Sequence, residues 1–551
     1  MKQILGIILF IFSTSLQAAA GIASAHPLAT QAGEKILAQG GNAFDAAVAI
    51  SAALAVVEPY SSGIGGGGFW LLHRSRDDFE TMIDGREKAP LQAHRDMYLD
   101  KQGDVIAKAS MDGPLSAGIP GVPAALAHLS KKYGKLSLKQ SLQPAIEYAQ
   151  QGFKVTPHYQ TLAKFRLAAL NASPAAAKIF LQKGEVPELG YLIKQADLAK
   201  TLQAMAEKGA DGFYKGTVAQ KMIQGVKEAG GIWRQKDLMQ YSVIERKPII
   251  GEFHGMKVTS AAPPSSGGIA ILEILNQLSY YPLDNMNNTQ AIHLTIEAMR
   301  RAYRDRAQFL GDTDFVSVPI KRLISQDYAA GLVAGTHPDK AMPSDLLPGV
   351  VHENNSQDTT HFSVIDHEGN RVSATLSINY PFGSCFVAPG TGVLLNDEMD
   401  DFSAKPGVAN AYGLVGAEAN AIQPGKRMLS SMSPTFLETD DRLAVIGTPG
   451  GSRIITMVLL GSLGFYLGEN ASQIVNAPRF HHQYLPDNVA FEPDAFNQKI
   501  QHALNNKNHK LKESNGTWGN MQLVIWDKKN KKMTAASDGR GEGLAKVILA
   551  E

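Results

Sequence analysis

Residues 359–379 carry a threonine, a serine and an asparagine that one hairpin would bring together, although composition alone favours an ordinary strand because Thr and Ser are common in strands. The alternating pattern predicts a β-hairpin whose first strand begins at Thr359 and whose second strand ends near Asn379. If residues 367–369 form the loop, Thr359 lies opposite Ser377, and Ser377 and Asn379 share one face. A shift of one residue in the pairing would turn both side chains away. In the favoured register a threonine, a second hydroxyl and an amide converge at the start of a strand that follows an exposed loop.

Two other patterns resemble functional motifs but lack the context that those motifs need. The glycines of residues 63–68 have the spacing of a dinucleotide-binding loop, yet they follow a predicted helix and precede the strand 69–72. That order is the reverse of the required one, so we interpret the run as a tight backbone turn. His481 and His482 are adjacent and would face opposite ways on a strand, which argues against a zinc pair. The sequence also has no H-E-x-x-H motif, so we expect a site without metal or cofactor.

The elements that must position the hairpin are helical before it and strand-rich after it. Asn42 is a good helix cap, and Pro27 stands near the start of the preceding helix, which two glycines end. The predicted segments are a helix at 27–39, a helix from Asn42 towards residue 58, a mostly helical region at 121–342, an exposed polar loop at 342–355, a strand at 443–446, a glycine turn at 447–451 and a helix from about residue 452.

Composition and charge exclude several classes of function. The chain has 551 residues, enough to bury a large core without covalent cross-links. Lys plus Arg number 53 against 52 Asp plus Glu, a formal net charge of +1, which gives no reason to expect nucleic acid or an anionic membrane as a partner. Cys385 is the single cysteine, so an internal disulfide and a cysteine-ligated metal cluster are excluded.

The first twenty residues have the pattern of a secretory signal. Lys2 supplies a positive charge, residues 4–16 are apolar, and small residues follow at 18–20. No later segment reaches 18 uninterrupted apolar residues, so no membrane span is expected after removal of the signal. We therefore predict a signal peptide at residues 1–20 and an exported protein, periplasmic or secreted.

Several separated motifs resemble those of the gamma-glutamyltransferase (glutathione hydrolase) family. They lie at residues 65–68, 84–90, 358–363, 395–403, 429–434 and 448–453. The resemblance covers about residues 21–545, and the motifs occur in the family's order. It implies an N-terminal-nucleophile hydrolase of the α+β class, a four-layer α-β-β-α sandwich. It also implies a single precursor that cleaves itself between Asp358 and Thr359 into a large subunit, 21–358, and a small subunit, 359–551, which stay associated.

Such cleavage explains why the nucleophile must be terminal. The Thr359 hydroxyl can attack the preceding carbonyl, and the cleavage then frees the α-amine of Thr359. An α-amine has a pKa of about 8, so it can act as the base for its own hydroxyl near neutrality, whereas a lysine at about 10.4 would be mostly protonated. The resemblance implies that the N–H groups of Gly450 and Gly451 form the oxyanion hole. Ser377 stands where many relatives have threonine, so the hydroxyl is kept without the methyl group that restricts it.

A gamma-glutamyl donor offers an α-carboxylate, an α-ammonium and the reacting γ-carbonyl. By resemblance, Arg86 binds the carboxylate through its two-pronged guanidinium. The other implied contacts are Ser430 and Ser431 to the carboxylate, Asn379, Glu398 and Asp401 to the ammonium, and Tyr412 in a lid loop at 405–416. The implied partners are glutathione or another gamma-glutamyl donor, and water, an amino acid or a peptide as acceptor.

Two alternatives remain open at this stage. The first is another amidase of the same family, such as a cephalosporin or glutaryl acylase. Glu398 and Asp401 argue against a glutaryl acylase, because a glutaryl group has no ammonium for them to bind. The second is a periplasmic amino-acid-binding protein, which would not need a threonine after an exposed loop.

Overall fold

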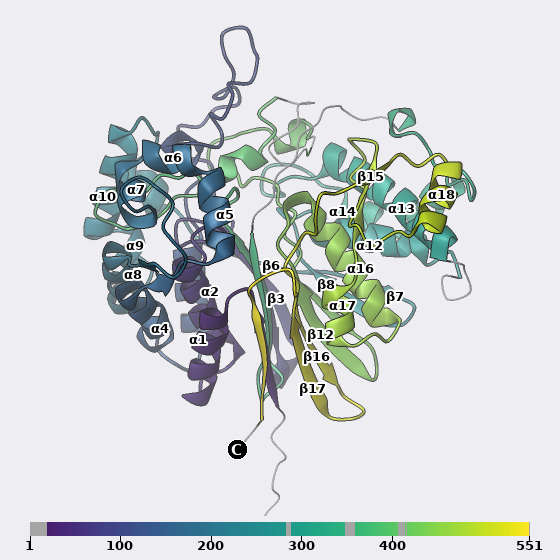
Figure 1. The fold of residues 1–551 in the computed structure, drawn as a ribbon, viewed down its shortest axis with the longest axis horizontal. Coiled ribbons are helices and arrows are strands. Elements are labelled where there is room, and N and C mark those ends of the chain that lie inside the picture. The colour runs from purple at the N-terminus through teal and green to yellow at the C-terminus, as the bar shows by residue number, and fades with distance from the viewer. Residues whose placement is uncertain (1–18, 283–287, 348–358, 406–413, 415, 550–551) are drawn as a thin grey trace, which may run out of the picture.

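Two antiparallel β-sheets lie face to face at the centre of the molecule, and helices cover the outer side of each (Figure 1). The structure is a computed structural model that describes residues 19–282, 288–347, 359–405, 414 and 416–549. The predicted four-layer sandwich is confirmed. In the part of the chain described, no helix is both long and apolar enough to cross a membrane.

The first sheet has seven strands in the order β18-β1-β9-β10-β2-β3-β6, and the second has six in the order β17-β16-β12-β11-β8-β7. The strands of the first sheet are β1 Ala20–Ser24, β2 Gly67–Arg74, β3 Phe79–Asp84, β6 Ile244–Arg246, β9 Thr360–Ile365, β10 Arg371–Ser377 and β18 Leu544–Ile548. Those of the second are β7 Ile249–Phe253, β8 Met256–Ser260, β11 Thr435–Glu438, β12 Arg442–Gly447, β16 Gln522–Asp527 and β17 Lys532–Ser537. Shorter strands pair away from these sheets at β4 Phe153–Lys154, β5 Leu192–Ile193, β13 Phe480–His481, β14 Val489–Phe491 and β15 Leu511–Glu513.

The helices divide between the two sides according to their place in the chain (Figure 1). On the side of the first sheet lie α1 Pro27–Ala38, α2 Ala43–Val57, α3 Val122–Lys132, α4 Leu138–Gln151, α5 Pro157–Phe165, α6 Leu167–Ala172, α7 Pro174–Phe180, α8 Ala196–Lys208, α9 Asp211–Tyr214, α10 Gly216–Glu228 and α11 Gln235–Met239. On the side of the second lie α12 Gly267–Leu278, α13 Asn288–Phe309, α14 Ile320–Leu323, α15 Gln326–Ala334, α16 Ile454–Tyr466, α17 Ala471–Asn476 and α18 Gln498–Asn506.

The beginning of the chain follows the sequence prediction closely. Asn42 caps α2 with a reciprocal capping box, in which the Asp45 carboxylate accepts a hydrogen bond from the Asn42 N–H. Every residue of α2 is buried, which suits its alanine-rich sequence because the helix is enclosed on all sides. Ala20 is the first residue of β1 and pairs with Ile548, so the predicted signal-peptide boundary falls inside the first strand.

Strands β9 and β10 differ from the half-buried alternation that their sequence indicates, because both of their faces are buried. Phe362 and Val364 pack towards the helices of the first side, whereas His361 and Ser363 face the second sheet. The His361 ring bonds to the hydroxyls of Thr375 and Ser363 at 2.8 and 3.1 Å. In a four-layer sandwich both faces of each sheet are covered. The alternating side chains of these strands therefore point to two buried faces, not to one buried and one solvent-exposed face.

Gly447 at the end of β12 makes room for the His361 ring between the sheets. A Cβ atom at this position would lie 2.2 Å from Cε1 of His361. The contact therefore holds β9, which begins beside Thr359, close to β12, which leads into Gly450 and Gly451. Of the predicted loop at 342–355, only residues 342–347 lie within the described chain.

Candidate active site

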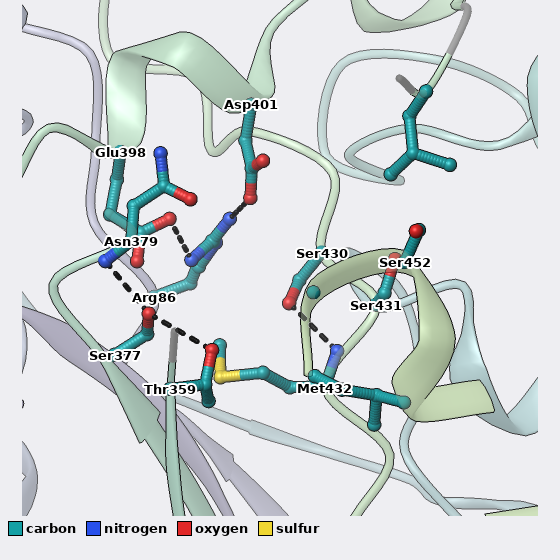
Figure 2. A pocket seen from close by; sticks show the side chains of 13 residues that line it. Arg86, Thr359, Ser377, Asn379, Glu398, Asp401, Ser430, Ser431, Met432 and Ser452 are labelled. Carbon is teal, nitrogen blue, oxygen red and sulfur yellow. Dashed lines mark hydrogen bonds and ion pairs between the residues drawn. The ribbon is translucent and has the colours of Figure 1, made fainter. Parts of the chain in front are cut away.

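Thr359 lies at the head of β9 with its side chain beside Ser377 (Figure 2). The pairing of β9 with β10 has the predicted register, and Thr359 Oγ1 is 3.4 Å from Ser377 Oγ. Ser377 is the last residue of β10, so Asn379 does not reach the site by strand alternation. The chain turns at Asn379 with a φ of 75°, and its N–H donates to Ser377 Oγ at 2.8 Å. The asparagine side chain donates to the carbonyl of Asp397 at 3.1 Å.

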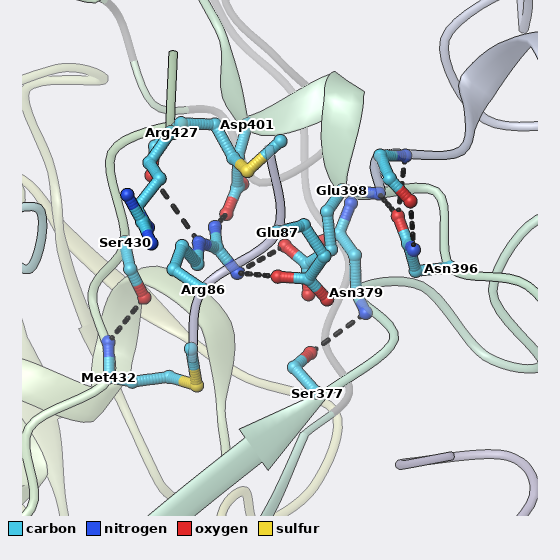
Figure 3. A network of polar contacts seen from close by, with 12 residues as sticks. Arg86, Glu87, Ser377, Asn379, Asn396, Glu398, Asp401, Arg427, Ser430 and Met432 are labelled. Carbon is cyan, nitrogen blue, oxygen red and sulfur yellow. Dashed lines mark hydrogen bonds and ion pairs between the residues drawn. The ribbon is translucent and has the colours of Figure 1, made fainter. Parts of the chain in front are cut away.

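Arg86 lies just beyond β3, and two acidic residues from far along the chain hold it (Figure 3). Its Nη1 is 2.5 Å from Glu398 Oε2, and its Nη2 bonds to Asp401 Oδ2. The Tyr241 hydroxyl donates to the Arg86 carbonyl at 2.7 Å, which fixes the backbone. The Arg86 side chain is only 1% exposed, so it is a buried ion-pair partner and not a surface residue.

The electrostatics of this cluster follow from its burial. Burial by itself lowers the pKa of Arg86, but the charges of Glu398 and Asp401 outweigh it and raise that pKa above its usual range. Burial raises the pKa of Glu398 to about 7, against the opposing effect of Arg86. Burial, and then the charge of Glu398, raise the pKa of Glu87 well above its usual range. Burial therefore favours the protonated form of both acids, and a positive charge bound beside Glu398 opposes this effect.

Ser430 and Ser431 face the same cavity from the loop before β11 (Figure 2). Ser430 Oγ accepts a hydrogen bond from the Met432 N–H at 3.1 Å. Ser431 Oγ accepts from Nη2 of Arg306 on α13 at 3.1 Å, and Nε of the same arginine donates to Ser266 Oγ at 3.0 Å. The two hydroxyls are thus held in place by partners behind them.

Gly450 and Gly451 form the turn between β12 and α16, as predicted. Their φ angles of 140° and 55° lie in a region that favours glycine. A Cβ on Gly450 would also lie 2.4 Å from Cε of Met457. The turn therefore needs glycine at both positions. Two cavities include Thr359 in their lining, and Gly451 lines one of them while Gly450 lines the other.

Most of the predicted site residues line one cavity (Figure 2). They are Arg86, Thr359, Ser377, Asn379, Glu398, Asp401, Ser430, Ser431 and Gly451. Gly450 lines the neighbouring cavity, which also reaches Thr359. Asp358 and Tyr412 fall outside the described residues. Leu414, which belongs to the predicted lid loop at 405–416, is described and lines the cavity.

The glycine run that leads into β2 is a tight turn, as expected from its order in the chain. A Cβ on Gly65 would lie 2.0 Å from the Leu394 carbonyl oxygen, and one on Gly66 would lie 2.1 Å from that of Ser377. At Gly67 it would lie 2.3 Å from Glu87 Oε2. The glycines therefore let this turn approach the end of β10 and the buried acid.

Sequence reasoning missed three residues that support the site. Glu87 and Asn396 belong to motifs already noted, but nothing in the sequence showed that they point inward. Asn396 bonds to the carbonyls of Gly65 and Gly118 and accepts from the Glu398 N–H (Figure 3). Arg306 lies in no recognised motif, and only the structure shows that it is buried on α13 and bonds to Ser431. Within the described ranges, no group of three or more His, Cys, Asp or Glu side chains could hold a metal ion, and His481 bonds to Thr456 and Gln483 instead.

Comparison with known proteins gives a consistent result. The glutathione hydrolase proenzyme of Pseudomonas sp. (strain A14) is 45% identical over 493 residues, which cover 88% of this chain and 85% of that protein. The glutathione hydrolase proenzyme of Escherichia coli (strain K12) is 44% identical over 485 residues, 86% of this chain and 83% of that protein.

Solved structures share the same fold. The cephalosporin acylase of Bacillus halodurans superposes with a TM-score of 0.84 at 27% identity, over 96% of each chain. A chain of the Helicobacter pylori gamma-glutamyltranspeptidase superposes with a TM-score of 0.58 at 42% identity, over 63% of this chain and 100% of its own length. The gamma-glutamyltranspeptidase sequence model matches residues 29–548. This chain belongs to the gamma-glutamyltranspeptidase family.

Proposed function

We propose that this protein is a glutathione hydrolase and gamma-glutamyltransferase. It cleaves the gamma-glutamyl amide bond of glutathione and its conjugates and passes the gamma-glutamyl group to water or to an amine acceptor. The observation that carries this proposal is the meeting of the Thr359–Ser377 hydroxyl pair with the buried Arg86–Glu398–Asp401 cluster in one cavity. The names of relatives at 44–45% identity support it.

The cluster suits a zwitterionic head group. Without substrate, Arg86 pairs with Glu398 and Asp401. An α-amino acid brings a carboxylate for Arg86 and an ammonium for the two acids, so one set of ion pairs replaces another without leaving a buried charge alone. Ser430 and Ser431 donate to the carboxylate, and Asn379 accepts from the ammonium. The reacting γ-carbonyl then extends towards Thr359, at the other end of the cavity.

The catalytic cycle uses an ester on Thr359. The free α-amine takes the proton of the Thr359 hydroxyl as Oγ1 attacks the γ-carbonyl carbon. The N–H groups of Gly450 and Gly451 stabilise the oxyanion, a contribution that typically lowers the barrier by about 3–4 kcal/mol per donor. Ser377 Oγ, at 3.4 Å, positions the attacking hydroxyl. The α-amine returns its proton to the leaving amine, and water or an acceptor then cleaves the ester.

This cycle requires a free α-amine, so the chain must be a precursor. We propose cleavage between Asp358 and Thr359 into a large subunit, 21–358, and a small subunit, 359–551. The word proenzyme in the names of the relatives supports a precursor. The matched Helicobacter pylori chain covers a share of this chain close to that of the proposed large subunit. We also propose export after removal of residues 1–20, to the periplasm or the medium.

A cephalosporin acylase activity is the second candidate, because one close structural neighbour bears that name. Its 27% identity is well below the 44–45% of the glutathione hydrolases. The two acids beside Arg86 favour a substrate with an ammonium group.

Purification of the wild type and of Thr359→Ala tests the proposal. We expect two polypeptides from the wild type, the smaller beginning at Thr359, and release of p-nitroaniline from gamma-glutamyl-p-nitroanilide. Thr359→Ala should remain a single inactive chain, and Thr359→Ser should keep some cleavage because its hydroxyl remains. An active, uncleaved Thr359→Ala protein would require another nucleophile, and a preference of the wild type for glutaryl-cephalosporin would favour the second candidate.

A further inference from the structure

Arg306 is a buried cation whose hydrogen-bond partners are two serines. It lies on α13 and is 5% exposed. Its Nη2 donates to Ser431 Oγ at 3.1 Å, and its Nε donates to Ser266 Oγ at 3.0 Å. Burial lowers the pKa of Arg306, and the effects of Tyr303 and Asp401 offset this only in part. Among the residues that the structure describes, no acid forms an ion pair with this arginine, although a buried charge normally has such a partner.

Arg86 is in the reverse situation, because two acids already hold it. Glu398 and Asp401 bond to its two terminal nitrogens, so its charge is balanced within the protein. The proposed donor brings an ammonium that engages these acids and a carboxylate that needs positive charge nearby. Arg306 has positive charge that no acid in the described ranges pairs with, so it can favour the carboxylate in addition to Arg86.

The bond from Arg306 also fixes the direction of the Ser431 hydroxyl. A guanidinium can only donate, so Ser431 Oγ must accept from it, and the single hydroxyl hydrogen must point to another acceptor. Ser431 lines the same cavity as Arg86 and Thr359, and its hydroxyl hydrogen has no acceptor within the described part of the chain (Figure 2). This hydrogen is therefore available to an anion in the cavity, and the charge behind it strengthens the bond that it donates.

Ser266 links the same arginine to the neighbouring serine of the cavity. Because Ser266 Oγ accepts from Arg306, its own hydrogen is free to bond to the Ser430 carbonyl, 2.7 Å away. The Ser266 N–H donates to that carbonyl as well, at 2.8 Å. One guanidinium thus holds the side chain of Ser431 directly and the backbone of Ser430 through one intervening hydroxyl.

We propose that Arg306 is a positioning residue that selects donors with a carboxylate: it turns the Ser431 hydroxyl hydrogen towards the cavity and places a positive charge behind it. This inference rests on the proposed gamma-glutamyl transfer. Arg306 does not touch the donor and acts through Ser431, whereas Arg86 binds the carboxylate itself. Its contribution should therefore depend on the carboxylate of the donor and on the hydroxyl of Ser431.

The first test compares donors with and without the carboxylate. Gamma-glutamyl-p-nitroanilide has it, whereas 4-aminobutanoyl-p-nitroanilide keeps the ammonium and the reacting carbonyl and has hydrogen in its place. For Arg306→Gln we expect the KM for the first donor to rise roughly tenfold with kcat within about twofold, because the carboxylate is bound alike in ground and transition states. The kcat/KM for the second donor should stay within about twofold of the wild type. Arg306→Lys keeps the charge, so its KM for the first donor should lie between the other two.

The second test asks whether the effect passes through Ser431. In a Ser431→Ala background the hydroxyl is absent, so Arg306→Gln should raise the KM for gamma-glutamyl-p-nitroanilide less than it does in the wild type. The control is Arg304→Gln, on the same helix, where the side chain is 19% exposed and pairs with Asp305. This control should change the kinetics with neither donor.

Equal losses with the two donors would overturn the inference, because they would show that Arg306 only supports the fold. An unchanged KM for gamma-glutamyl-p-nitroanilide, or an equal effect of Arg306→Gln with and without the Ser431 hydroxyl, would also overturn it. If Arg306→Gln does not fold, Arg306→Lys decides in its place: a loss confined to the donor with the carboxylate supports the inference, and equal losses refute it. If the wild type does not act on gamma-glutamyl-p-nitroanilide, the proposed function itself fails.

Discussion

Replacement of Arg86 by lysine tests the buried cluster most directly. Arg86 is 1% exposed and bonds through separate nitrogens to Glu398 and Asp401. A lysine ammonium is a point charge and cannot reproduce this fork, so one charge-assisted hydrogen bond is lost. Such a bond contributes about 1.5–3 kcal/mol to stability. A chain of this length unfolds with an entropy of about 1.1 kcal/mol per degree, so we expect the calorimetric unfolding midpoint to fall by roughly 1–3 °C.

The same substitution should reduce catalysis. If Arg86 binds the donor carboxylate through two parallel bonds, the variant loses one of them in the transition state as well. We expect kcat/KM for gamma-glutamyl-p-nitroanilide to fall roughly ten- to a hundredfold, while autocleavage continues. Initial rates on the purified, processed variant measure this loss.

Arg95 provides a matched control for Arg86→Lys, because it forms a similar two-pronged pair with Glu418 on the surface. Solvent screens that pair, so Arg95→Lys should leave the unfolding midpoint and kcat/KM unchanged. Arg86→Lys with a wild-type midpoint would show that the buried pairing does not stabilise the fold as argued. A wild-type kcat/KM would show that Arg86 does not bind the donor.

Two further substitutions test the surroundings of the site. The Glu398→Gln variant should become more stable relative to the wild type as pH rises from about 4.5 to 7, by at most about 3 kcal/mol. The reason is that burial raises the pKa of Glu398, so its ionisation in the folded wild type costs stability in that pH range. Urea unfolding curves of both proteins at several pH values measure this difference, and a difference that does not change with pH would refute the argument. Gly447→Ala should lower the free energy of unfolding by about 1–3 kcal/mol and also reduce kcat, since the new Cβ would lie 2.2 Å from the His361 ring. Gly331→Ala in α15, where a Cβ meets no atom within 4 Å, is its control, and an equal effect of the two changes would refute the packing argument.

The local parts of the site followed from the sequence. The pairing that places Thr359 opposite Ser377 was predictable because hairpin register depends on a short loop and on the alternation of adjacent strands. The Asn42 cap and the turn at Gly450 and Gly451 depend in the same way on neighbouring residues. The motifs further indicated that Arg86 belongs with this hairpin, although the two are far apart in the chain.

Only the tertiary structure decided how the distant groups meet. Arg86 pairs with acids more than 300 positions away, and Arg306 supports Ser431 across the helical layer. Neither contact leaves a periodic pattern in the sequence, because the packing of whole layers decides which side chains meet when they are far apart in the chain. The burial of both faces of β9 has the same cause, since it depends on the second sheet and on α2 rather than on the strand itself. The sequence by itself thus determined the hairpin that begins beside Thr359 and the family, whereas the layered packing determined which charged groups surround this hairpin and how strongly burial shifts their pKa values.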